Sequence, residues 1–353
     1  MSETVSAPAA ASPGLVAALR NMVRPQAASI EKDIDFAAPG AARLGRDVGT
    51  FDPVRLARLD SFTRAVVFVV TLLTFGGARA LGLQIEPGGL SIAIGVVAFM
   101  LAAAWLYSTA RPAPRLAAGT LMVAELIYYG IVFIVFSYVM LAAAGPERAP
   151  VLSRIDQALG FDWKAYTDTL SASPRLLAAM EECYGSIAWQ DFLIPTCLLL
   201  WGRLGWLRVF MNGFALGATA TVLIAFLVPA IDARALYTLD LSDARHLVSG
   251  FRLTDDYLQV RDGRLVLLDM DRLTGIVSFP SFHTYLALLF LVGSWPLRKL
   301  WWCLLPVNVL LIASTPKFGF HYLVDVVGGF AVAALVLGAT MKYLRVRPPA
   351  PAA

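Results

Sequence analysis

Charged side chains are scarce in this 353-residue sequence, at 15% of the residues, whereas hydrophobic side chains make up 58%. A soluble domain carries about 25% charged residues, so the composition excludes an ordinary soluble protein and predicts one built for the lipid bilayer. The net charge is only +4, and we expect no nucleic-acid partner. Membrane lipids are the partners that this composition favours.

Cysteine is also rare: the chain has three, an odd number without C-x-x-C spacing. Neither a disulfide framework nor a zinc site is indicated, and we expect no metal and no cofactor. Residues 1–60 lack an apolar core segment, which argues against a signal peptide, and their composition is typical of a disordered tail. The predicted division is a cytoplasmic tail over residues 1–60, a polytopic membrane domain over 61–345 with its core at about 116–345, and a cytoplasmic tail over 346–353.

Long apolar segments occupy most of the remaining chain. A membrane-spanning helix needs about 20 mostly apolar residues, and eight segments qualify. They are residues 64–83, 90–110, 116–144, 183–202, 209–231, 279–297, 300–316 and 322–341. The seventh is short and contains Pro306, so it is the least secure span. Gly213 and Gly217 in the fifth have a spacing that favours close helix packing. The sequence therefore predicts an all-α integral membrane protein with about eight transmembrane helices.

Lysine and arginine gather on one side of this arrangement. The clusters precede the first span and follow the second, fourth, sixth and eighth, and they include Arg55, Arg58, Arg111, Arg115, Arg203, Arg208, Arg298, Lys299 and Lys342. The positive-inside rule assigns that side to the cytoplasm, which predicts a multi-pass protein of the cell (inner) membrane with both termini inside. The long loops 145–182 and 232–278 fall on the other side.

The two long loops carry local patterns of their own. In loop 145–182, residues 151–159 and 175–180 have helix-like patterning. In loop 232–278, residues 257–260 and 264–268 alternate around Asp262-Gly263, which predicts a β-hairpin.

Histidine is rare, and two of the three histidines in the chain lie where predicted spans begin. His283 ends the segment Phe-Pro-Ser-Phe-His, and His321 lies four residues before Asp325. Both segments begin on the extracytoplasmic side of the eight-span topology, so the two histidines can meet there. We expect the third, His246, to be a solvated loop residue.

Each part of this arrangement suggests a chemical role. Pro280 suits the first position of a helix, and the free amides that follow, with the Ser281 hydroxyl, form an anion site. On a helix His321 and Asp325 share one face, so the carboxylate can hold one imidazole nitrogen and leave the other as a nucleophile. His283 can serve as general acid and then general base. A structural role is the usual alternative for a lone histidine, but ionisable residues in spans are functional hypotheses by default.

The motif Pro-Ser-x-His at 280–283, followed by His-x-x-x-Asp at 321–325, resembles the type-2 phosphatidic acid phosphatase superfamily. That superfamily includes lipid phosphate phosphatases and soluble vanadium haloperoxidases. Residues 275–283 and 319–329 look most like its inositol-phosphorylceramide synthase (inositolphosphotransferase) branch and bacterial relatives. Similarity to that branch also extends to residues 154–156, 159–162 and 261–263. The resemblance covers about residues 150–345 and implies a six-helix catalytic core.

The resemblance also implies roles for individual residues. His321 would attack phosphorus to give a phosphohistidine, Asp325 would orient it, and His283 would be the general acid and base. Ser281 and the nearby amides would hold the phosphoryl oxygens, without a metal.

The resemblance is incomplete at the cationic groups that hold phosphate. The motif Lys-x6-Arg-Pro is absent, Thr315 stands where the third motif has arginine, and Phe282 replaces a glycine. Another cation must then bind the phosphate. Lys317 is the first candidate because it is nearest to His321 in sequence. Arg234, Arg272 and Arg245 lie in the long loop on the same side.

These observations predict a metal-independent lipid phosphatase or phosphotransferase that acts on a lipid phosphate or phospho-head group at the extracytoplasmic face. Hydrolysis and transfer to an alcohol, such as inositol or a ceramide-type acceptor, use the same residues. Both reactions are therefore kept as alternatives. The rival is a non-catalytic lipid transporter or scaffold that retains the fold, but intact His283, His321 and Asp325 argue against it. Haloperoxidase activity is disfavoured because those relatives are soluble. The sequence does not indicate an oligomeric state.

Overall fold

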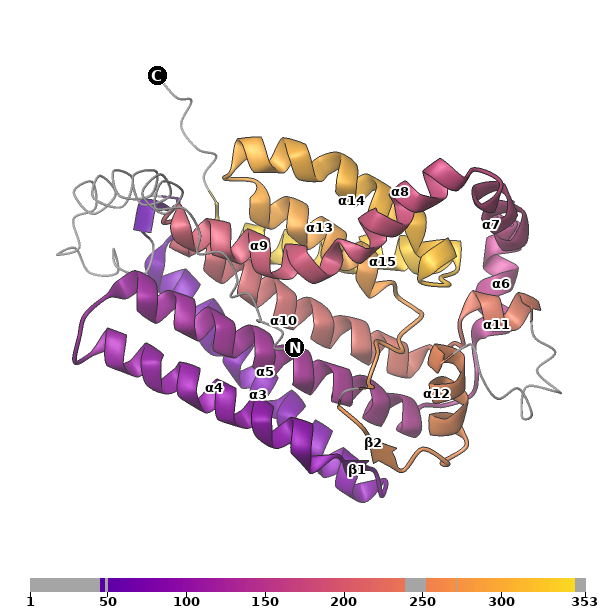
Figure 1. The fold of residues 1–353 in the computed structure, drawn as a ribbon, viewed down its shortest axis with the longest axis horizontal. Coiled ribbons are helices and arrows are strands. Elements are labelled where there is room, and N and C mark those ends of the chain that lie inside the picture. The colour runs from indigo at the N-terminus through magenta and orange to yellow at the C-terminus, as the bar shows by residue number, and fades with distance from the viewer. Residues whose placement is uncertain (1–44, 48–49, 239–251, 271, 347–353) are drawn as a thin grey trace, which may run out of the picture.

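The computed structural model describes residues 45–47, 50–238, 252–270 and 272–346, and these are mostly helical (Figure 1). The helices are η1 Gly45–Asp47, α3 Pro53–Ala80, α4 Pro87–Ser108, α5 Pro114–Ala143, α6 Ala149–Ala158, α7 Trp163–Ser171, α8 Pro174–Gly185, α9 Ile187–Leu200, α10 Leu204–Leu227, α11 Ala233–Thr238, α12 Arg252–Arg261, α13 Phe282–Ser294, α14 Arg298–Phe318 and α15 Leu323–Leu344. Two short strands, β1 Gln84–Ile85 and β2 Leu267–Leu268, complete the fold. The chain is an all-α membrane protein, as predicted.

Each of the eight predicted spans contains an apolar helix. Six helices in the described part of the chain, α3, α4, α5, α10, α14 and α15, are long and apolar enough to cross a membrane, and α9 and α13 are apolar but shorter. The prediction about the weakest span was wrong, because α14 continues through Pro306 for 21 residues. The short helix is instead the 13-residue α13, about 20 Å long at 1.5 Å per residue. Pro296 follows its end after Trp295, and a proline has no N–H to continue the helical hydrogen bonds.

The long helices run back and forth between two ends of the molecule (Figure 1). One end carries α6, α7, α11, α12 and the strand pair, together with the starts of α13 and α15. At the other end the start of α3 meets the end of α15, where the Arg55 Nη1 donates to the Tyr343 carbonyl at 2.7 Å. The long loops therefore lie at the end where both histidine segments begin. Which end faces the cytoplasm stays a prediction.

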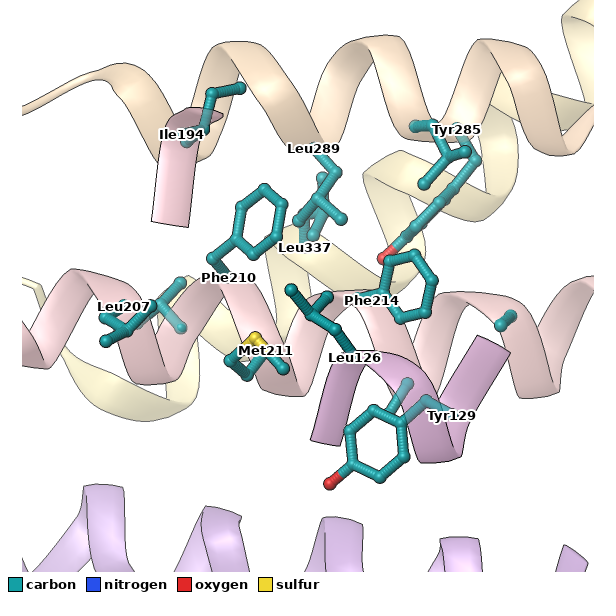
Figure 2. Close-up of a cluster of buried hydrophobic side chains, with 14 of the residues drawn as sticks. Leu126, Tyr129, Ile194, Leu207, Phe210, Met211, Phe214, Tyr285, Leu289 and Leu337 are labelled. Atoms are coloured by element: carbon teal, nitrogen blue, oxygen red, sulfur yellow. The ribbon is translucent and has the colours of Figure 1, made fainter. Parts of the chain in front are cut away.

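Helix α10 lies in the middle of the bundle, packed against α3, α5, α13 and α15. Figure 2 shows side chains from several of these helices meeting around its aromatic residues. The Tyr285 ring of α13 lies on Gly217, where any Cβ would overlap it, and the Tyr285 hydroxyl donates to the Gly213 carbonyl at 2.6 Å. The Gly213 and Gly217 spacing thus allows close packing, as predicted, and it draws α13 onto the core.

A partly buried charge network ties helices together at the end opposite the histidines. Arg208 of α10 lies 3.3 Å from Asp60 of α3 and 2.8 Å from Glu125 of α5, and Asn212 also donates to Asp60 at 2.6 Å. The sequence interpretation treated Arg208 as a topology signal and missed this packing role. Removing one partner of a fully buried pair typically costs about 3–5 kcal/mol, and the cost here should be smaller because the Arg208 and Asp60 side chains are each 16% exposed.

Helix α3 begins earlier than predicted. The Asp52 carboxylate accepts hydrogen bonds from the Val54 and Arg55 amides at 2.8 and 3.3 Å, and Pro53 takes the first helical position. This cap starts the helix at Pro53, so residues 53–60, predicted as tail, are helical. Residues 1–44 lie outside the described residues.

The predicted β-hairpin around Asp262-Gly263 was wrong. Residues 252–261 form α12, and Gly263 adopts a φ of 66° just past its end, which is a common way to end a helix. The Arg261 Nη1 holds α12 against the end of α5 by donating to the Ala144 carbonyl at 2.7 Å. Strand β2 instead pairs in parallel with β1, with Gln84 opposite Leu267. The helical patterns predicted in loop 145–182 are confirmed by α6 and α8.

Candidate active site

His321 and Asp325 lie together at the start of α15. The Asp325 Oδ2 accepts from the Tyr322 amide at 3.0 Å and the Ser278 hydroxyl at 2.8 Å, and it lies 3.1 Å from the His321 Nδ1. Both His321 and Asp325 are buried. The predicted pairing is present, but for a different reason, because His321 precedes the helix rather than lying on it. Asp325 caps the start of α15, and this cap brings its carboxylate onto the imidazole.

Asp325 sets the direction of the His321 hydrogen bond. An ionised carboxylate only accepts hydrogen bonds, so the His321 Nδ1 carries the hydrogen and its Nε2 presents a lone pair. That lone pair is the nucleophile predicted from the sequence.

His283 faces this nitrogen from the first turn of α13. Its Nδ1 lies 3.2 Å from the His321 Nε2, and the two ring centroids are 5.4 Å apart with the planes at 70°. The start of α13 can approach α15 this closely because Gly329 has no side chain, since a Cβ there would lie 2.6 Å from the Ser281 carbonyl oxygen. The Ser281 amide also donates to the Asp325 carbonyl at 2.9 Å. The structure therefore joins the three predicted catalytic residues.

Tyr184, which the sequence did not identify as a site residue, contacts the ring nitrogen of His283 that points away from His321. Its hydroxyl lies 2.7 Å from the His283 Nε2, and its ring stacks on the imidazole at a centroid distance of 4.8 Å. Tyr184 comes from α8, 99 residues before His283. No local pattern marks a single tyrosine as the partner of a residue so distant in sequence.

Asp156 holds the start of α15 from a different helix. Its two carboxylate oxygens accept hydrogen bonds from the Leu323 and Val324 amides at 2.7 and 2.8 Å. Burial raises the pKa of Asp156, although these two amide hydrogen bonds lower it, and the neighbouring charge of Asp325 adds to the rise. The sequence resemblance included residues 154–156 without assigning them a role, and the structure shows that Asp156 positions the segment that carries His321.

A cavity of about 510 Å³ opens beside the two histidines and Tyr184. Its other walls are largely apolar, with Phe133, Ile134, Phe214, Val222, Phe282 and Phe318 among them. Among the described residues, no Lys, Arg, Asp or Glu lines it. The cavity thus places an apolar, uncharged space against the nucleophilic nitrogen.

The predicted phosphate ligands do not line this cavity. The Ser281 hydroxyl accepts from the Thr284 amide at 3.3 Å and caps α13. The Lys317 Nζ lies 2.8 Å from the Ser171 hydroxyl of α7, and Arg272 is paired with Asp269 at 3.1 Å.

Arg234 contacts the residue that precedes His321 in the chain. Its guanidinium is 3.7 Å from the ring centroid of Phe320, the residue before His321. Arg245 and His246 lie outside the described residues. The cation that holds phosphate therefore stays a prediction.

A family model described as the PAP2 superfamily matches residues 150–339, which is more than half of the chain. The matched range contains His283, His321 and Asp325, as well as Asp156 and Tyr184. No curated protein and no solved structure matches the chain.

Proposed function

The chain belongs to the PAP2 superfamily, and we therefore propose that it transfers a phosphoryl group from a lipid phosphate through a covalent intermediate on His321. The superfamily match supports a lipid phosphatase-type enzyme. The observation that carries the mechanism is the hydrogen-bonded series from Asp325 through His321 to His283. Such a series provides a nucleophile, a group that orients it and an acid–base residue within reach of one phosphorus atom.

In the first step the His321 Nε2 attacks phosphorus. The N–P bond forms as the P–O bond to the leaving group breaks, and the protonated His283 gives its Nδ1 proton to the leaving oxygen. The phosphorylated imidazole is positively charged, and the Asp325 carboxylate at 3.1 Å stabilises that charge. A phosphoryl group bound at this position must separate the two histidines, which are 3.2 Å apart.

In the second step an acceptor oxygen attacks the phosphohistidine. His283, now neutral, takes the acceptor's proton on Nδ1, the new P–O bond forms, and the N–P bond breaks with its electron pair returning to the His321 Nε2. The acceptor is water in hydrolysis and an alcohol in head-group transfer. The apolar cavity beside the histidines supports an acceptor or substrate with an apolar body, such as a ceramide-type lipid.

The phosphoryl oxygens need hydrogen-bond donors. The first turn of α13 supplies amides that no intrahelical acceptor satisfies, and Phe282 and His283 of that turn line the cavity. Arg234 is the cation we favour, because it lies against Phe320 next to His321. On the charge pattern of the sequence, the site faces the extracytoplasmic side.

The proposal is tested with purified protein in detergent micelles. A panel of phosphatidic acid, a ceramide phosphate, and phosphatidylinositol with ceramide is scored for released phosphate and for new phospholipid. We expect turnover that survives EDTA and is abolished in His321→Ala. The matched control is Tyr166→Phe, which removes a tyrosine hydroxyl bonded to the Ala313 carbonyl at 2.6 Å, away from the histidines. Lipid binding without turnover by the wild type would favour the transporter or scaffold, and full activity in His321→Ala would refute the mechanism.

A further inference from the structure

We propose that Tyr184 is a positioning residue that keeps the Nδ1 of His283 as the nitrogen that exchanges protons during the reaction. This inference rests on the proposed function and extends it to a residue that takes no part in bond formation. The proposal is based on a continuous series of four side chains, Tyr184, His283, His321 and Asp325. In this series the Tyr184 hydroxyl lies 2.7 Å from the His283 Nε2, and the His283 Nδ1 lies 3.2 Å from the His321 Nε2.

The positions of the hydrogen atoms in this series follow from Asp325, at one end of it. Asp325 accepts from the His321 Nδ1, so the His321 Nε2 has a lone pair and can only accept. The His283 Nδ1 must then carry a hydrogen to bond to it. When His283 is neutral its Nε2 has no hydrogen, and the Tyr184 hydroxyl donates to it. In neutral His283 the hydrogen on Nδ1 therefore lies beside the His321 Nε2, the proposed nucleophile.

A tyrosine hydroxyl suits both forms of His283 that the mechanism needs. The protonated ring carries hydrogens on both nitrogens, and its Nε2 then donates to the Tyr184 oxygen. After His283 gives its Nδ1 proton to the leaving group, the Nε2 hydrogen stays bonded to Tyr184, and Nδ1 is free to accept the next proton. A hydroxyl both donates and accepts, so Tyr184 can pair with Nε2 through the whole cycle.

The packing fixes this contact. The Tyr184 ring stacks on the His283 ring with a 24° angle between the planes, and Phe318 lies beside it at a centroid distance of 5.9 Å. The titratable groups that face His283 are Tyr184 from α8 and His321, with Asp325 behind it, from the start of α15. The remaining cavity wall has no Lys, Arg, Asp or Glu in the part of the chain that the structure describes. Tyr184 is therefore the group that can satisfy a protonated Nε2.

The test replaces Tyr184 with phenylalanine, which keeps the stacked ring and removes only the hydroxyl. Both forms of His283 then lose a hydrogen bond to the hydroxyl, but the bond of the protonated form is charge-assisted and worth about 1 kcal/mol more, which lowers the titration by up to about one pH unit. We expect the high-pH limb of the kcat/KM profile to move to lower pH by that amount, with a loss of up to about tenfold at neutral pH. Tyr166→Phe should reproduce the wild-type profile.

A second measurement does not depend on turnover. The chain has only three histidines, so 15N-histidine labelling gives a simple spectrum, and a His283→Gln sample assigns the His283 signals. We expect the His283 nitrogens of Tyr184→Phe to titrate at lower pH than those of the wild type, while Tyr166→Phe titrates as the wild type does.

The outcomes separate this inference from the proposed function. An unshifted pH profile and an unshifted His283 titration in Tyr184→Phe, in a protein whose His321→Ala variant is inactive, would overturn the role of Tyr184 alone. A shifted His283 titration in a protein that turns over no lipid phosphate would uphold the contact and refute the proposed function. A loss of activity in Tyr184→Phe without a change in the pH profile would also contradict the inference, because it would indicate a merely structural role.

Discussion

Replacing Asp325 with asparagine removes a charge from the site without removing a hydrogen-bond acceptor. The three donors around this residue, the Ser278 hydroxyl, the Tyr322 amide and the His321 Nδ1, all meet Oδ2, and Oδ1 has no hydrogen-bond partner among the described residues. An asparagine can therefore place its oxygen toward the three donors and its amino group on the other side. The His321 tautomer and orientation should survive the substitution.

The expected loss in Asp325→Asn is thus electrostatic. Without the carboxylate, the positively charged phosphohistidine loses its counter-charge, and removing one stabilising group of this kind typically costs about 10²–10³ in rate. Asp325→Ala should behave differently, because it leaves up to three donors without an acceptor. At about 1–3 kcal/mol for each unsatisfied buried donor, its free energy of unfolding should fall by roughly 3–9 kcal/mol if all three lose their acceptor.

The assay compares kcat/KM and thermal unfolding in detergent for the wild type, Asp325→Asn and Asp325→Ala. Asp325→Asn should unfold near the wild-type temperature with activity reduced by about 10²–10³, and Asp325→Ala should be both inactive and less stable. Wild-type activity in Asp325→Asn would show that the charge has no catalytic role. Equal destabilisation of the two variants would show that the three hydrogen bonds to Oδ2 are not as described.

Three other predictions follow from the surroundings of the site. Asp156→Ala should lower stability by about 1–2 kcal/mol, as loss of a helix cap does, and should reduce kcat more than it raises KM, measured by steady-state kinetics. If Arg234 holds the phosphate, Arg234→Ala should lower kcat/KM at least about tenfold while Lys317→Ala leaves it unchanged, and the reverse result would restore Lys317 as the clamp. On a background without Cys183 and Cys303, an impermeant thiol reagent should label Lys164→Cys in intact cells and not Arg111→Cys, and the opposite pattern would invert the topology.

The membrane helices could be predicted because their signal is local. A run of apolar residues long enough for the bilayer is visible in the sequence, and each of the eight runs contains an apolar helix. The helix ends depended on single residues that the runs do not show. The Asp52 cap extends α3 to Pro53, and Pro296 follows the early end of α13. The Asp262-Gly263 pair fits either a hairpin turn or a helix end, and contacts of α12 with α5 decide between them.

The centre of the site could also be predicted, because the chain holds few residues with its chemistry. Two histidines at the starts of spans on one side of the membrane, with an acid close to one of them, left few other interpretations. The supporting groups could not be predicted in the same way. Asp156 reaches its amide partners across 167 and 168 residues, and Tyr184 reaches His283 across 99. Nothing in the local sequence distinguishes them from other buried acids or tyrosines, since their roles arise only from packing.

The proposed mechanism requires a covalent phosphohistidine on His321, and this intermediate can be trapped. The purified protein is mixed with a 32P-labelled lipid phosphate and quenched in alkali, which preserves phosphohistidine, and the modified peptide is located by mass spectrometry. We predict label on the peptide that carries His321, a larger amount in His283→Ala if the second step is slowed more than the first, and none in His321→Ala. Turnover of the lipid without label on His321, or label that persists in His321→Ala, would refute the phosphohistidine mechanism.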